Sequence, residues 1–231
     1  MRRFWKDVTV EPEDDRWAIK LDGRPVRTPA RALLALPTEA LAEAIATEWN
    51  AVGETVDPRA MPLTGLANAA IDRVEPERQA FADGLARYAE ADLACYRAEG
   101  PQKLIGLEEQ QWGTLLGWAR RRYDAEFVTT SGLIHVAQPP ATIARLSQAV
   151  APLDPFRLAG VSPLITIGAS LIAALAVLEK AITPDEAWDA VSLDERWQLE
   201  RWGADAEAEA RLSNRRRDFL AAAAFLELLD G

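Results

Sequence analysis

The chain has 231 residues, of which 49% are hydrophobic and 27% are charged, a balance typical of a folded protein with one or two domains. Its formal net charge of -10 would repel a phosphate backbone, which argues against a nucleic-acid-binding protein. One cysteine and one histidine exclude an intrachain disulfide, a cysteine-rich metal site and a multi-histidine metal site.

The first 36 residues alternate between apolar and polar side chains, as half-buried β-strands do. Asp22-Gly23 predicts a type I′ hairpin turn, and Pro25 marks the returning strand as an edge strand. From Thr38, a plausible N-cap, the period changes to that of a helix. The proline-rich loop that follows marks a domain boundary near residue 60.

Most of the remaining chain shows helical periodicity. The predicted fold is therefore α+β, with a small β-rich N-terminal domain over residues 1–60, made of antiparallel strands plus a helix, and a larger all-α helical domain over 61–231. Two segments, 92–97 and 127–136, have β character. Whether they return to the N-terminal sheet is left open.

The longest uncharged segment runs for 21 residues from Leu158 to Leu178. Ser162-Pro163 predicts a helix start, and a helix from there to Leu178 would be about 24 Å long, short of the ~30 Å of a bilayer core. A buried core helix is favoured over a membrane span. The N-terminus resembles no secretory signal, so we expect a cytoplasmic protein without stable membrane insertion.

No familiar catalytic or cofactor-binding motif occurs in the sequence, so we predict no catalytic residue, no cofactor and no metal site. Cys95 and His135 could form a nucleophile and base, but a buried cysteine is the favoured interpretation. Glu108-Glu109 is interpreted as a solvated face rather than a pair of acids. Arg215-Arg216-Arg217 is expected to pair with acidic residues of its own helix rather than to bind an anion.

One predicted helix, from Pro184 to Trp202, carries an acidic residue on an apolar face. Thr183 and Glu186 form a capping box at its start. At 100° per residue, Glu195 falls among aromatic and apolar neighbours. The aromatic and apolar neighbours are Trp188, Val191, Leu199 and Trp202, and the polar Gln198 lies on the same face. Glu195 either pairs with an arginine of a neighbouring helix or contacts a partner, and the two interpretations have equal weight.

Four short motifs occur in order along the chain, and together they resemble the Atp-twelve family of ATP-synthase assembly chaperones. They are Ala46-Thr47-Glu48-Trp49, Cys95-Tyr96-Arg97 followed by Pro101, Trp112 with Trp118 through Arg122-Tyr123, and Glu195-x-Trp197-Gln198-x-x-x-Trp202-Gly203. Each motif is weak alone, and their shared order and spacing make the resemblance specific.

The resemblance implies a non-enzymatic chaperone that binds the unassembled alpha subunit of the ATP-synthase catalytic sector and prevents its aggregation. It also implies an orthogonal helical domain, a bacterial cytoplasmic location, and a mitochondrial matrix location for eukaryotic relatives. The expected partner-binding residues are Glu195, Trp49, Trp188, Gln198 and Trp202, and a monomer is expected. The alternatives are a hydrolase or lyase with an unrecognised acid/base site, such as Glu195 with an arginine or with His135, and a structural scaffold subunit.

Overall fold

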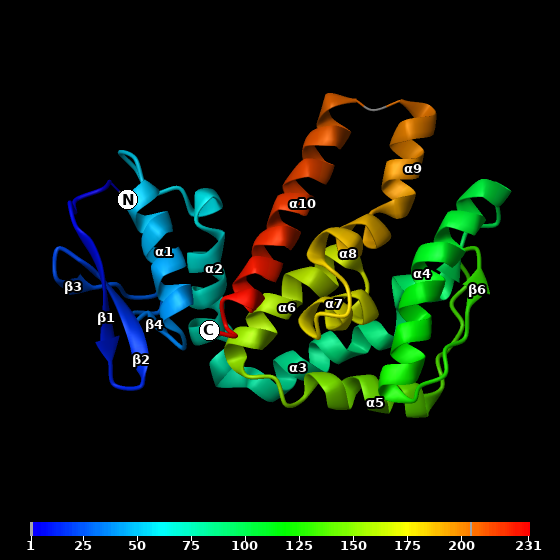
Figure 1. The fold of residues 1–231 in the computed structure, drawn as a ribbon, viewed down its shortest axis with the longest axis horizontal. Coiled ribbons are helices and arrows are strands. Elements are labelled where there is room, and N and C mark those ends of the chain that lie inside the picture. Colours follow the sequence, from blue (N-terminus) through cyan, green and yellow to red (C-terminus); the bar gives the residue numbers. More distant parts are fainter. Residues whose placement is uncertain (1, 204) are drawn as a thin grey trace. The chain divides into compact units, whose positions relative to one another are not determined.

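The computed structural model describes residues 2–203 and 205–231, and its chain divides into two compact units (Figure 1). The first, called here the sheet unit, contains the residues up to 78 together with 154–160 and 221–231. The second, the helical unit, contains 79–153 and 161–220. Neither unit is a continuous piece of chain. The α+β class predicted from the sequence is confirmed.

The sheet unit begins with a four-stranded antiparallel sheet, in which β2 pairs with all three other strands. Helix α1 packs on β1 and β2 (Figure 1). The elements up to residue 78 are β1 (Val8–Glu13), β2 (Arg16–Leu21), β3 (Arg24–Pro25), β4 (Ala35–Leu36), α1 (Glu39–Ala51), α2 (Pro62–Ala69) and the helical turns η1 (Pro58–Ala60), η2 (Ala70–Val74) and η3 (Glu75–Glu77).

The local signals in this region are confirmed. Asp22 and Gly23 have positive φ angles of 48° and 76°, as a type I′ turn between β2 and β3 requires. Pro25 lies in β3, at the edge of the sheet. The Thr38 side chain accepts a hydrogen bond from the Leu41 N–H and caps α1.

Two carboxylates accept hydrogen bonds from residues that are distant in sequence, and these contacts explain why the sheet unit extends past the predicted boundary at residue 60. Glu48, on α1, accepts hydrogen bonds of 2.8 Å from the N–H groups of Leu63 and Thr64 at the start of α2. Asp72 accepts a 2.6 Å hydrogen bond from the Thr28 hydroxyl. Both contacts join segments on either side of residue 60. The predicted boundary was based on the proline-rich loop alone, and the composition of a loop does not indicate such contacts.

Two later segments complete the sheet unit. They belong to α6 (Pro155–Gly168) and α10 (Ala206–Glu227), and each of these helices continues into the helical unit. The Phe156 and Phe225 rings stack with centroids 6.4 Å apart. A Cβ added at Gly160 would lie 2.6 Å from a Leu226 methyl carbon, so a residue without a side chain permits this close approach.

The helical unit contains one small sheet of its own. Strands β5 (Tyr96–Arg97) and β6 (Thr130–Ser131) pair in parallel with each other. The segments 92–97 and 127–136 therefore do not return to the N-terminal sheet. The remaining elements are α3 (Arg78–Ala86), η4 (Arg87–Ala91), η5 (Leu93–Cys95), α4 (Gln102–Tyr123), α5 (Pro140–Val150), α7 (Leu171–Leu178), α8 (Pro184–Val191) and α9 (Leu193–Trp202).

The uncharged segment from Leu158 to Leu178 forms parts of two helices rather than one. Pro163 lies inside α6, so the predicted helix start there is wrong. Residues around it, including Leu158 and Leu164, are fully buried, and this packing outweighs the unfavourable effect of an internal proline. No helix among the described residues is long and apolar enough to cross a membrane. The sequence also predicts a long last helix from about Ala204 to Leu229, and the start of that helix lies outside the described residues.

A buried carboxyl group, Asp92, connects two elements of the helical unit. One of its oxygens accepts hydrogen bonds from the Ala94 N–H at 3.0 Å and the Ser170 hydroxyl at 2.8 Å. The other accepts from the Ile172 N–H at 2.9 Å. Asp92 is completely buried, and this burial raises its pKa to about 6.

The substitution Asp92→Asn should lower the free energy of unfolding by about 1–3 kcal/mol near pH 4, because the hydroxyl oxygen of the neutral carboxyl group can accept from the Ile172 N–H and an amide NH2 group cannot. The folded-state pKa of about 6 lies above the ordinary value of 3.8, so the folded protein binds more protons between these values. The contribution of Asp92 to stability is therefore lost as the pH rises through this window. Urea unfolding should show a gap between wild type and variant that shrinks between about pH 4 and about pH 7. A gap independent of pH would contradict this account.

Candidate functional site

The predicted helix from Pro184 to Trp202 is two helices, α8 and α9. Ser192 separates them, with φ of −101° and ψ of 7°, and its hydroxyl donates a 2.6 Å hydrogen bond to the Trp188 carbonyl. The capping box at the start of α8 is confirmed. Because the helix is interrupted, Trp188 and Glu195 do not share one continuous helical face, and the predicted face joining them is wrong.

Two of the predicted partner-binding tryptophans lie in hydrophobic cores. Trp188 is 3% exposed, and its ring centroid is 5.6 Å from that of Phe219. Trp49 is 8% exposed and packs edge-on against Trp5 at 5.2 Å. Each ring is covered by its own unit, so the structure gives both residues a packing role. A direct contact with a partner stays a prediction.

Glu195 forms an ion pair with Arg215 of α10. The nearest nitrogen and oxygen atoms are 2.5 Å apart, and a second Arg215 nitrogen donates to the Ile167 carbonyl at 2.8 Å. The side chain of Glu195 is still 47% exposed. The structure thus confirms the salt-bridge interpretation and leaves the carboxylate accessible. A pair this exposed contributes no more than about 1 kcal/mol to stability.

The arginine run is paired differently from the prediction. Arg215 and Arg216 reach α9 and α8, since Arg216 pairs with Asp185 at 2.6 Å. Arg217 pairs with its neighbour Asp218 at 3.1 Å. The predicted pairing within one helix is therefore wrong for the first two arginines.

The three remaining predicted partner-binding residues, Glu195, Gln198 and Trp202, all belong to α9. Glu195 and Gln198 line a groove of about 270 Å³ between α9 and α10. Trp202, one helical turn after Gln198, is 81% exposed. Because an exposed tryptophan of this size is common at protein interfaces, we define Glu195, Gln198 and Trp202 as the α9 face.

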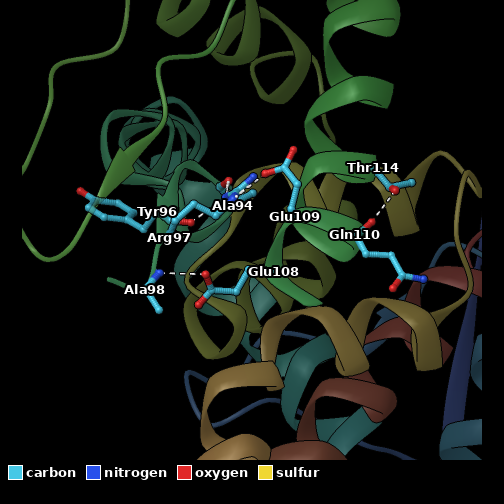
Figure 2. Close-up of polar contacts among 8 residues, drawn as sticks. All are labelled: Ala94, Tyr96, Arg97, Ala98, Glu108, Glu109, Gln110 and Thr114. Atoms are coloured by element: carbon cyan, nitrogen blue, oxygen red, sulfur yellow. Dashed lines mark hydrogen bonds and ion pairs between the residues drawn. The ribbon is translucent and has the colours of Figure 1, made fainter. Parts of the chain in front are cut away.

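A second groove in the helical unit contains acidic residues that are not exposed. Glu108, on α4, is completely buried, and one of its oxygens accepts a 2.8 Å hydrogen bond from the Ala98 N–H. Figure 2 shows Glu108 and Glu109 turned toward different partners, Ala98 and Arg97. The interpretation of this acidic pair as a solvated face is therefore wrong for Glu108.

Asp194, on α9, faces Glu108. Burial and this neighbouring carboxylate raise the pKa of Glu108 to about 7. Burial also raises the pKa of Asp194, while its hydrogen bond with Glu108 acts in the opposite direction. Glu108 is thus the residue that retains the shared proton. One oxygen of each side chain has no other hydrogen-bond partner among the described residues.

Arg97 connects this region to the core. Its side chain is 8% exposed and donates to the carbonyls of Ala94 and Tyr96 at 2.8 and 2.6 Å, and to Glu109 at 2.9 Å. Its guanidinium also lies 5.7 Å from the centre of the Trp112 ring. Figure 2 shows these contacts beside the start of α4. Arg97 is therefore committed to contacts within the helical unit.

The family model described as ATP12 chaperone protein matches residues 2–120 of this chain. The chain belongs to this family. The solved structure of Atp12 from Paracoccus denitrificans is 43% identical, with a TM-score of 0.93, and the match covers 99% of this chain and 98% of that chain.

Two further relatives support the assignment to the ATP12 family. The structure of the Atu1473 protein from Agrobacterium tumefaciens is 38% identical, with a TM-score of 0.93 and coverage of 99% of this chain and 86% of that chain. The mitochondrial protein atp12 of Schizosaccharomyces pombe is 26% identical over 241 residues, covering 97% of this chain and 81% of the relative. The similarity thus extends over nearly the whole chain.

The thiol of this ATP12-family chain is unsuited to nucleophilic catalysis. Cys95 is 2% exposed, and burial, with Asp92 nearby, raises its pKa to about 12. His135 lies 3.4 Å from the Tyr96 hydroxyl. Within residues 2–203 and 205–231, no group of three or more histidine, cysteine or acidic side chains is arranged to hold a metal ion.

The buried acids of the ATP12-family chain had a partial signal in the sequence. Glu108 is four residues after Leu104 and four before Trp112, so all three lie on one face of α4. Asp194 had no comparable signal, because its position depends on the break at Ser192.

Proposed function

We propose that this ATP12-family chaperone binds the unassembled alpha subunit of the ATP-synthase catalytic sector and keeps it from aggregating until it joins the beta subunit. Membership of the ATP12 family carries the proposal, since it places the chain among chaperones of ATP-synthase assembly. The proposed chaperone acts without catalysis, as a monomer, in the cytoplasm of a bacterium.

The α9 face supports the proposal physically. It offers a large apolar ring, that of Trp202, beside an accessible charge at Glu195. Aromatic anchors contribute most of the binding energy at many interfaces, whereas neighbouring charges speed encounter and disfavour wrong partners. An unassembled subunit exposes apolar surface that is later covered, and such a surface needs a complement of this kind.

The test is co-purification of the alpha subunit with the tagged chaperone. Trp202→Ala should reduce binding of the subunit by about tenfold or more, because it removes an exposed aromatic anchor. Glu195→Lys should also weaken binding, since it reverses the charge beside that anchor. Phe4→Ala is a matched control, because Phe4 is an exposed aromatic residue, 60% accessible, in the sheet unit.

Each outcome of this experiment has a defined meaning. Equal recovery and equal protection from aggregation by wild type, Trp202→Ala and Glu195→Lys would show that the α9 face does not bind the client. Failure of the wild-type protein to associate with the alpha subunit would reject the proposed function. A stable stoichiometric complex in the mature enzyme would instead identify a structural subunit.

A further inference from the structure

The groove that contains Glu108 and Asp194 has a volume of about 590 Å³, larger than the 270 Å³ groove between α9 and α10, and Gln198 is the residue of the α9 face that also lines it. It lies wholly within the helical unit. Its walls combine apolar and acidic side chains. They include Leu93, Leu104, Glu108, Trp112, Leu133 and Asp194.

The two acids at the base of this groove are unusual in their hydrogen bonding. Glu108 is completely buried, yet one of its oxygens faces Asp194 instead of a donor N–H or O–H group. The matching Asp194 oxygen is also without a donor among the described residues. Burying a carboxylate without a donor is costly, so the pair requires either a shared proton or a cation.

The charges around the groove make a cation from outside the chain the complementary ligand. Glu99 adds a third carboxylate to the lining. Arg97 also lines the wall; it donates to Glu109 and to two carbonyl groups, and its charge acts to lower the pKa of Glu108. The groove lining therefore contains three carboxyl groups and one arginine, an excess of acidic side chains that a cation from outside the chain would complement.

The rim of the groove adds an apolar feature. Leu133 lines the groove and is 98% exposed, and the adjacent Ile134 is 77% exposed. Two neighbouring aliphatic side chains this exposed favour an apolar partner. An occupant that matches both the base and the rim has a positive charge next to an aliphatic or aromatic side chain.

We propose that this groove binds a segment of the client polypeptide in which a lysine or arginine is flanked by apolar residues. The cationic group displaces the shared proton and pairs with Asp194, the half-buried member of the pair, beside the ionised Glu108, and the apolar neighbours cover Leu133 and Ile134. This inference rests on the proposed chaperone function, because it assigns the groove to the client.

The variant Glu108→Gln tests the groove with little risk to the fold. A glutamine carbonyl can still accept from the Ala98 N–H, and its amide can donate permanently to Asp194, so the internal contacts are kept. The negative charge needed for a cation is lost. Glu109→Gln is the matched control, because it removes the same charge one residue away from a side chain that is 70% exposed.

Two measurements together decide the proposal. The first is the affinity of the alpha subunit for the full chain, which Glu108→Gln should weaken by about tenfold while Glu109→Gln leaves it nearly unchanged. The second does not involve the client. Butylguanidinium should shift the NMR signal of the Trp112 indole N–H in wild type, whereas neutral butylurea should not, and Glu108→Gln should abolish the shift.

The results separate failure of this inference from failure of the proposed function. If the wild-type protein binds the alpha subunit and Glu108→Gln binds equally well, the groove is not a client site, although the proposed function stands. If butylguanidinium leaves the Trp112 signal unchanged, the acids do not accept a cation, and the inference is rejected even where the client does not bind. A shift abolished by Glu108→Gln, with weaker client binding, supports it.

Discussion

Replacing Trp112 with alanine should lower the free energy of unfolding by about 3–5 kcal/mol, the usual cost of removing a fully buried aromatic side chain. Trp112 is 2% exposed and is among the largest buried side chains of the helical unit. Its indole N–H donates a 2.8 Å hydrogen bond to the Ala190 carbonyl on α8. The variant therefore loses apolar contacts and also leaves a buried carbonyl without its donor.

Urea unfolding followed by circular dichroism measures this loss. Trp112→Phe should fall between wild type and alanine, because it keeps a six-membered aromatic ring but loses the hydrogen bond to Ala190 and part of the buried indole. Trp202→Ala is the matched control and should change stability by less than about 0.5 kcal/mol, since its ring is 81% exposed. A loss below about 1 kcal/mol for Trp112→Ala would show that α4 and α8 are not held together by this residue.

Arg97→Ala should lower the free energy of unfolding by about 2–4 kcal/mol. The substitution removes the donors to the Ala94 and Tyr96 carbonyls and uncovers one face of Trp112. Arg97→Lys should recover only part of the loss, because an ammonium group cannot reproduce the forked donors of a guanidinium.

The contribution of Glu109 to this arginine is expected to be small. Its side chain is 70% exposed, and an ion pair at such a site contributes no more than about 1 kcal/mol. Urea unfolding of Arg97→Ala, Glu109→Gln and the double variant forms a cycle that separates the ion pair from the two carbonyl contacts. If Glu109→Gln were as destabilising as Arg97→Ala, the ion pair rather than the carbonyl contacts would hold Arg97.

Short-range signals predicted the sheet unit well. The Asp22-Gly23 turn, the edge position of Pro25 and the Thr38 cap each depend on a few neighbouring residues, and each is confirmed. The contacts that extend this unit past residue 60 were not predictable in the same way. They join Glu48 to α2 and Asp72 to Thr28, across separations that no local pattern encodes.

The candidate site also depends on contacts between residues that are distant in sequence, which the sequence pattern did not predict. Glu195 was correctly expected to have either an arginine partner or a client, but the helical wheel assumed that α8 and α9 were one helix. The break at Ser192 removes Trp188 from that face and brings Asp194 against Glu108. A buried acid on α4 becomes visible only when the element that covers it is known.

Because the sheet unit is divided along the chain, its folding cannot be completed until the last residues have been synthesised. Strands and helices up to residue 78 leave the ribosome first, yet their unit also needs 154–160 and 221–231. At about 5–20 residues per second, the interval between residues 78 and 221 lasts about 7–29 s. During this time the nascent sheet lacks the Phe156–Phe225 stack that completes it. A protein of a chaperone family thus spends part of its own synthesis with an incomplete core, exposed to the same hazard of aggregation as a client.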